Sequence, residues 1–340
     1  MILSYSVKIP GPYHIEKGLP CQDAFSVKAG KDGYYVAAVA DGLGSEKYSD
    51  IGSETAVNTA VQFCVDSLTS GMTDEDIQNV MRASFSQAYN RVLERAVSDG
   101  NSKNEYDTTL CLAVYCPDGH LCFGNSGDSG MVALLEDGHY LRLTSQQRNE
   151  VGNVFPLCFK DKWFFSSINK RIVSVMLMTD GVFEKICPPL MKHEQISVNI
   201  PVARQFLQLN CSSDELPEIE EKAKEFLENY PDLSDDKTVV VLINNELSPA
   251  ILEDSYYEDP DWSALMKKAI SRMNTNSNFS IQNSSKSKEK PIAHEKASKK
   301  SKTAISKKAR NFKLSRVILT ILFILLETAE LAILISHFYF

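Results

Sequence analysis

Over roughly the first 245 residues, short apolar runs rich in β-branched residues alternate with longer helical patterns. Strands are predicted at residues 2–9, 24–28, 34–40, 108–115, 120–124, 131–135, 172–178 and 238–243. Helices are predicted at residues 51–68, 74–98 and 215–229. Because three strands precede two long helices and a further run of strands follows, the order differs from a doubly wound sheet. It predicts an α+β fold with mostly antiparallel sheets and helices packed outside them.

The C-terminal third has a different pattern. After a short acidic extension at residues 249–273, residues 274–313 are rich in Ser, Asn and Lys, which predicts a disordered basic linker. The chain has a net charge of −8, but residues 286–316 hold twelve Lys and Arg against two Glu, a local charge of +10. Phe312 is the one aromatic residue in this run and no binding motif accompanies it, so nucleic acid is not an expected partner.

The linker leads into an apolar stretch at residues 317–335, "VILTILFILLETAELAILI", which is 19 residues long. That length suits a bilayer core, so residues 314–340 are predicted to form a single transmembrane anchor, with an interfacial or protein-docking helix as alternatives. Glu327 and Glu330 lie on one face of this helix and suggest a transmembrane partner or protonation. The flanking basic cluster would stay on the cytoplasmic side and keep the N-terminal body there too.

The eight cysteines are scattered, mostly within apolar runs, and form no C-x-x-C pair. They are expected to be reduced core residues of a cytosolic protein, which argues against a zinc or disulfide framework. With 43% apolar residues, the chain has enough material for a substantial core.

Four acidic positions share one setting at the ends of predicted strands. Asp41 follows "YYVAAVA", Asp128 follows "LCFGNSG", Asp180 follows "VSVMLMT", and Asp235 or Asp236 precedes "KTVVVLI". Carboxylates on rigid strand ends suit a hard divalent cation such as Mg²⁺ or Mn²⁺ rather than zinc. The alternative for any one of them is ordinary Asp-Gly turn chemistry.

Five motifs also carry a family resemblance. They are "CQDAF" (21–25), "VADGLGS" (39–45), "GNSGDSG" (124–130), "MTDGVFE" (178–184) and "DDKTVVV" (235–241). Their order and spacing resemble the metal-dependent protein serine/threonine phosphatases of type 2C, in particular a bacterial branch. The resemblance spans residues 5 to 244 and implies a catalytic domain at residues 1–248. The implied fold is a four-layer α-β-β-α sandwich of two antiparallel sheets.

The resemblance also implies roles for individual residues. Asp41 would bridge two Mn²⁺ or Mg²⁺ ions, the carbonyl of Gly42 would ligate one of them, and Asp180 and Asp235 would complete the first shell. Asp23 would hold water ligands of the metal. Asp41, Asp23 and Asp180 are therefore the expected catalytic residues.

A third, weaker metal site is implied at Asp128 and Glu184. The expected chemistry is attack on phosphorus by a hydroxide bridging the two ions, without a covalent phospho-enzyme. The expected substrates are phosphoserine and phosphothreonine in cytoplasmic proteins, and the expected counterpart is a Ser/Thr kinase.

Three positions depart from the family pattern. Gly18 stands where the branch has a phosphate-gripping arginine, which leaves phosphate binding unassigned, with Lys17 and His14 as weak candidates; His14 is favoured as a structural hydrogen-bonder. Leu43 stands where many eukaryotic members have a histidine, and Gly130 replaces the arginine of "GDSR". The alternative function is therefore a weakly active or inactive phosphatase-like module that binds phosphoproteins or regulates a membrane complex.

A variable flap is implied between Ser145 and Arg171. Its aromatic residues Trp163, Phe164 and Phe165 are expected to pack the loop onto the sheet, with contact to a phosphoprotein as the alternative.

Overall fold

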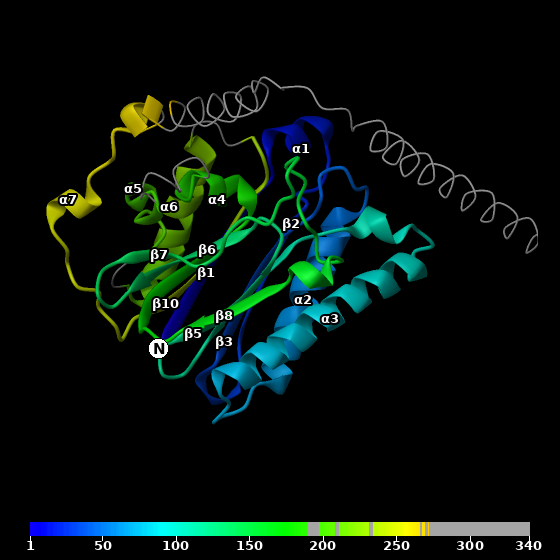
Figure 1. The fold of residues 1–340 in the computed structure, drawn as a ribbon, viewed down its shortest axis with the longest axis horizontal. Helices are drawn as coiled ribbons and strands as arrows, with labels where there is room; N and C mark the ends of the chain where they lie inside the picture. Colours follow the sequence, from blue (N-terminus) through cyan, green and yellow to red (C-terminus); the bar gives the residue numbers. More distant parts are fainter. Residues whose placement is uncertain (189–196, 208–210, 231–233, 266, 269–270, 272–340) are drawn as a thin grey trace, which may run out of the picture. The chain divides into compact units, whose positions relative to one another are not determined.

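The computed structural model describes residues 1–188, 197–207, 211–230, 234–265, 267–268 and 271. These residues belong to one compact unit, Met1–Asn274. It contains two five-stranded antiparallel sheets with helices on their outer faces (Figure 1). The predicted α+β sandwich is confirmed. The predicted membrane helix is not part of this description.

The first sheet has the strand order β1-β10-β9-β6-β7. Its strands are β1 (Ile2–Ile9), β10 (Lys237–Asn244), β9 (Ile172–Met178), β6 (Gly130–Leu135) and β7 (Tyr140–Arg142). The second sheet has the order β2-β3-β4-β5-β8. Its strands are β2 (Asp23–Ala29), β3 (Tyr35–Asp41), β4 (Leu110–Tyr115), β5 (Leu121–Ser126) and β8 (Phe164–Ile168).

The long helices α2 (Ser49–Ser67) and α3 (Asp74–Ser98) cover the second sheet, and α4 (Asp180–Ile186), α5 (Ile200–Ala203) and α6 (Leu216–Asn229) lie on the side of the first (Figure 1). The described residues also include the short helices α1 (Pro12–Lys17) and α7 (Asp254–Tyr257), with 3₁₀ turns η1 (Lys31–Gly33), η2 (Lys103–Tyr106), η3 (Lys160–Lys162) and η5 (Ser213–Glu215). The start of α3 is fixed by a capping box between Thr73 and Asp76, which accounts for its agreement with the predicted boundary.

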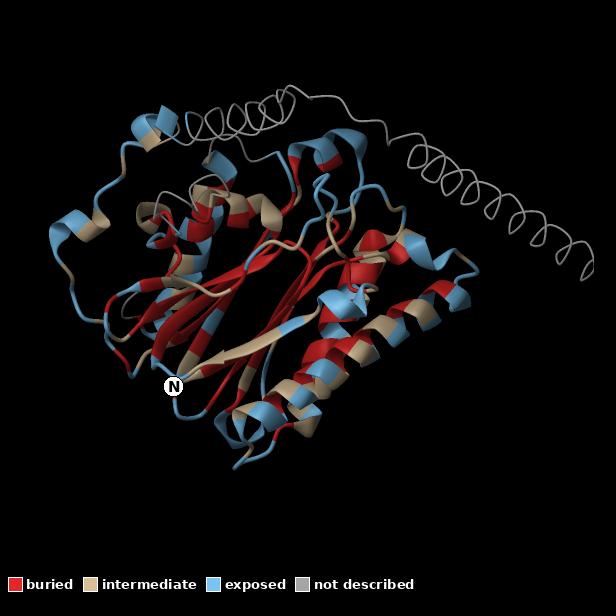
Figure 2. Ribbon diagram, viewed as in Figure 1, coloured by how far each residue is buried: buried red, intermediate tan, exposed pale blue. Residues whose placement is uncertain are grey.

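Apolar side chains fill three layers: one between the sheets and one between each sheet and its helices (Figure 2). Strands such as β4 and β9 are buried along their entire length because both faces are covered. This burial explains why they appear in the sequence as continuous apolar runs rather than alternating ones.

The flap aromatics have different environments. Trp163 and Phe165 pack edge-on against Phe85 of α3, with ring centroids 5.5 and 5.0 Å away, whereas Phe164 is 46% exposed. The predicted packing role therefore describes Trp163 and Phe165. Strands β7 and β8 were not predicted, since β7 is short and β8 is only partly buried.

Part of the C-terminal extension packs on the first sheet, where the backbone N–H of Tyr140 donates to the Tyr256 hydroxyl (2.8 Å). The predicted linker (274–313) and anchor (314–340) lie outside the described residues. Within the described ranges, no helix is both long and apolar enough to cross a bilayer.

Candidate metal centre

Carboxylates from both sheets converge at one end of the sandwich. Asp23 begins β2 and pairs in register with Asp41 at the end of β3. Asp128 follows β5, and Asp180 is the first residue of α4, directly after β9. Because the strands are antiparallel, alternate strand ends meet at this edge and bring together residues far apart in the sequence.

The separations are short enough for shared cation binding. Carboxylate oxygens of Asp41, Asp128 and Asp180 lie within 4.8 Å of one another. Asp23 is buried beside them, where the Thr179 hydroxyl donates to its Oδ2 (2.7 Å). The aspartates predicted from four separate motifs therefore form one cluster.

Two glycines allow the chain to approach itself closely at this cluster. A Cβ on Gly42 would lie 2.5 Å from the carbonyl oxygen of Ser49, and a Cβ on Gly181 would overlap the carbonyl oxygen of Asp236. The glycine after each aspartate is thus required by close backbone contact, a role beyond that of an ordinary turn residue.

The neighbouring residues Asp235 and Asp236 have different roles. The buried carboxylate of Asp236 accepts hydrogen bonds from the backbone N–H groups of Gly11 and Gln22 (both 2.6 Å) and contacts His14 Nδ1 (2.7 Å). Asp236 thereby holds the segment around α1 in place. Asp235, which accepts from the backbone N–H of Asp236 (2.8 Å), remains the candidate ligand of the two.

A cavity of about 320 Å³ opens over the cluster. The predicted site residues that line it are Asp41, Gly42, Asp128, Asp180, Asp235 and His14. Lys17 is not among the lining residues; it is exposed, and its ammonium lies 3.5 Å from Glu16. The contacts of His14 are those of a structural hydrogen-bonder.

Burial and mutual repulsion disfavour the charged forms of these carboxyl groups. Burial raises the pKa of Asp23 to about 7 and that of Asp180 to about 8. The pKa of Asp41 is raised well above its usual range, first by burial and then by Asp180 and Asp23. Bound cations would remove this cost.

The residues present fit hard divalent ions. Within the described part of the chain, Asp23 Oδ1 and Asp128 Oδ1 are buried without a hydrogen-bond partner. Carboxylate oxygens of this kind are the ligands that Mg²⁺ and Mn²⁺ prefer.

Arg148 is a cavity residue that the sequence did not single out. Its guanidinium lies 2.7 Å from Asp128, 3.1 Å from Asp180 and 3.1 Å from Glu184. Glu184, a predicted third-metal ligand, thus joins the cluster through Arg148. The only available signal was a lone arginine in the polar segment "SQQRNE" of the flap.

The sequence matches one family of known proteins. The family model described as protein phosphatase 2C matches residues 10–228. A search of curated protein sequences found no significant match.

Among solved structures, a bacterial serine phosphatase is similar with a TM-score of 0.51 and 12% identity, covering 74% of this chain and 100% of that one. The serine/threonine phosphatase Stp1 from Staphylococcus aureus has a TM-score of 0.51 and 13% identity, with 72% and 95% coverage. The S. agalactiae serine/threonine phosphatase has a TM-score of 0.51 and 16% identity, with 72% and 99% coverage. At these identities the likeness supports the shared fold.

Proposed function

Because the chain belongs to the protein phosphatase 2C family, we propose that it hydrolyses phosphoserine and phosphothreonine in proteins at the Asp41 cluster. Family membership confirms the enzyme class predicted from the motifs, a metal-dependent phosphatase that uses Mn²⁺ or Mg²⁺. The observation that carries the proposed site is the convergence of Asp41, Asp128 and Asp180 within 4.8 Å in an open cavity.

Asp41, Asp180, Asp235 and the Gly42 carbonyl would hold two ions, and Asp128 with Glu184 a third. When bound, such ions would lower the pKa of a coordinated water and neutralise phosphoryl charge. Asp23 is positioned by Thr179 to accept a hydrogen bond from a water at the cluster.

Arg148 supplies a positive charge at the cavity, where Gly18 supplies none. Its side chain is 34% exposed and lines the cavity, so it is accessible to a substrate phosphate. Arginine binds phosphate through paired N–H donors, and Arg148 is therefore the candidate for orienting the phosphoryl group.

The same side chain supports a second function. Its ion pairs with Asp128, Asp180 and Glu184 place a cation among the expected metal ligands. If Arg148 competes with metal there, the domain would be a weakly active module that binds phosphoproteins. Measured turnover distinguishes the two functions.

The decisive experiment measures phosphothreonine-peptide hydrolysis by the full chain with Mn²⁺, with Mg²⁺ and with EDTA. Asp41→Asn and Asp180→Asn should lose metal-dependent turnover, whereas Asp66→Asn, a change of an exposed carboxylate on α2, should retain it. Phosphopeptide binding without turnover by the unaltered protein would favour the binding module instead.

The proposal includes membrane tethering through residues 314–340, with the catalytic domain in the cytoplasm. Its support is the 19-residue apolar stretch and the basic segment before it. A Ser/Thr kinase would supply the phosphoproteins, and a partner helix could face Glu327 and Glu330. Deleting residues 314–340 should release the protein from the membrane fraction; continued sedimentation with membranes would refute the anchor.

A further inference from the structure

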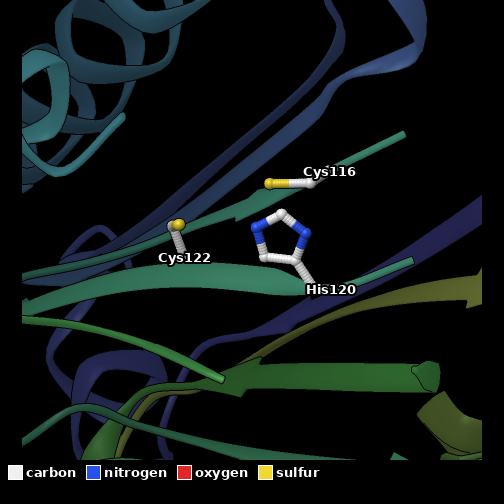
Figure 3. Close-up of side chains that lie close together, drawn as sticks. All are labelled: Cys116, His120 and Cys122. Carbon is white, nitrogen blue, oxygen red and sulfur yellow. The ribbon is translucent and has the colours of Figure 1, made fainter. Parts of the chain in front are cut away.

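A second cluster of metal-ligating side chains lies on the β4–β5 hairpin. Cys116 follows β4, His120 immediately precedes β5, and Cys122 lies within it. Figure 3 shows the two sulfur atoms and the imidazole ring facing a common space. Their Sγ atoms and a ring nitrogen all lie within 4.8 Å of one another.

The hairpin fixes this arrangement through its backbone. The N–H of Cys116 donates to the carbonyl of His120 (2.9 Å), and the N–H of Gly119 donates to the carbonyl of Cys116 (2.9 Å). Positions 116, 120 and 122 therefore project from the same face of the sheet, since 116 pairs with 120 and residues two apart share a face. The three ligand types are brought together by a tight turn, "CPDGHLC".

Two carboxylates complete the surroundings. Asp74, in the first turn of α3, places Oδ1 2.9 Å from His120 Nε2. Asp118, in the turn itself, places Oδ1 2.5 Å from His120 Nδ1. The histidine thus faces one carboxylate on each nitrogen, and Asp118 can orient the ring as an outer-shell partner.

We propose that Cys116, His120, Cys122 and Asp74 bind one zinc ion, with Asp118 accepting a hydrogen bond from the Nδ1–H of His120. Sulfur and imidazole ligands select zinc over Mg²⁺, and four ligands match its tetrahedral preference. Zinc bond lengths of about 2.0 to 2.3 Å require ligand atoms about 3.3 to 3.8 Å apart, so side-chain rotations would bring together the three hairpin ligands, which already lie within 4.8 Å of one another. Asp74, whose Oδ1 lies 2.9 Å from His120 Nε2, would turn from the imidazole toward the ion.

The net charge of the proposed site and its access to solvent are also compatible with zinc binding. Both cysteines are buried, whereas the side chains of His120 and Asp74 are 17% and 30% exposed, which leaves a route from solvent. On binding, the two thiols release their protons to solvent, and Zn²⁺ with two thiolates and one carboxylate carries a net charge of −1. That charge is favourable beside the N-terminus of α3, the positive end of the helix dipole.

The site would connect α3 to the sheet. Asp74 belongs to the helix and the other three ligands to the hairpin, so one ion would join two elements at the end of the sheet away from Asp41. Thr109 marks the catalytic end of β4 by bonding to Asp41, and Cys116 lies seven residues further along, about 23 Å for an extended chain. The proposed ion is therefore structural and separate from the phosphatase metals.

The test uses the full chain, reduced, freed of metal and then saturated with Mg²⁺ to occupy the acidic cluster. Titration with Co²⁺ should give a thiolate-to-cobalt charge-transfer band at one equivalent, which Zn²⁺ then bleaches. Carboxylate sites produce no such band, so the readout is specific to the cysteines.

Matched variants test which residues give rise to the charge-transfer band. Cys122→Ser should abolish it, Asp118→Asn should weaken cobalt binding by about tenfold or more, and Cys111→Ala should retain it. Cys111 is an apt control because it is also fully buried on β4 but packs on the opposite face of the sheet. Zn²⁺ should also raise the Tm of the Mg²⁺-saturated protein but not that of Cys122→Ser.

Absence of the band from the unaltered protein with free thiols would overturn the proposal, and this result needs no variant to fold. A Cys116–Cys122 disulfide found by mass spectrometry under the same reducing conditions would also overturn it.

Discussion

The two ends of the second sheet carry opposite coordination chemistry. At one end, Asp41 and Asp128 belong to a cluster of oxygen ligands in an open cavity. At the other, Cys116, His120 and Cys122 offer sulfur and nitrogen ligands packed under a helix. If both proposals hold, one sheet presents an open site for hard ions at one end and a largely buried site for a structural zinc ion at the other.

A substitution in the acidic cluster alone should have the largest effect on activity. Asp41→Asn removes the central carboxylate and should lower kcat by on the order of 10²–10³ or more. Cys122→Ser, at the other end, should leave kcat within about twofold at a temperature where both variants are folded. The measurement is steady-state phosphopeptide hydrolysis with Mn²⁺. Equal losses in the two variants would show that the two ends are not independent.

The pH dependence of stability should also separate the ends. Asp23 and Asp180 have folded-state pKa values of about 7 and 8, above the unfolded value near 3.9, so the folded protein holds their protons more tightly. Their contribution to stability is complete below pH 4 and is lost as pH rises through 7 to 8.

In EDTA, the Tm of the protein should therefore fall between pH 5 and pH 8, by on the order of 10 °C, and Mn²⁺ should reverse the fall. Zinc binding at the cysteines should instead strengthen over this range, because protons compete for thiolate and imidazole. Thermal melts at both pH values with each metal provide the check. A Tm in EDTA that is constant or rises with pH would contradict the assigned cause.

A smaller effect is expected when the arginine side chain beside the acidic cluster is removed. Arg148→Ala should raise KM for phosphopeptide by about tenfold, and Arg148→Lys should recover only part of that loss because lysine lacks the paired donors. Lys170→Ala, at an exposed ion pair with Asp137, serves as control. If Arg148→Ala instead lowers the Mn²⁺ concentration needed for half-maximal activity, Arg148 acts mainly as a competitor of the metal.

The smallest effect concerns the helix that supplies Asp74. Thr73 accepts from the backbone N–H of Asp76 and caps α3, so Thr73→Ala should lower the free energy of unfolding by about 1 kcal/mol. The same change should weaken cobalt binding, because the first turn positions Asp74. Urea unfolding and the cobalt titration measure the two effects. Gln87→Ala, at an exposed position of α3, is the comparison variant.

Much of the acidic site is predictable because each aspartate is marked by the residues next to it in the sequence. Asp41, Asp128 and Asp180 each follow a buried strand at the same edge, so their motifs alone indicate a shared site. The close contacts of Gly42 and Gly181 explain why glycine follows two of these aspartates. The start of α3 is likewise encoded by its own cap.

Contacts between distant segments were not predictable in this way. The sequence ranked Asp235 above Asp236 only through a family resemblance, whereas the hydrogen bonds of Asp236 to Gly11, His14 and Gln22 depend on segments more than 200 residues apart. Arg148 appeared as one polar residue of a variable flap until the fold brought it to three carboxylates.

The cysteines show the same limit most clearly. Their spacing, without a C-x-x-C pair, favoured eight independent core residues, and all eight are free thiols in the structure. Strand pairing nevertheless places Cys116 and Cys122 beside His120, and helix packing adds Asp74. The sequence by itself determined the sandwich, the family and the aspartates at the strand ends, because strand patterns and turns are local. Only the tertiary structure decided which side chains from separate elements share a site, because that depends on register and on helix packing.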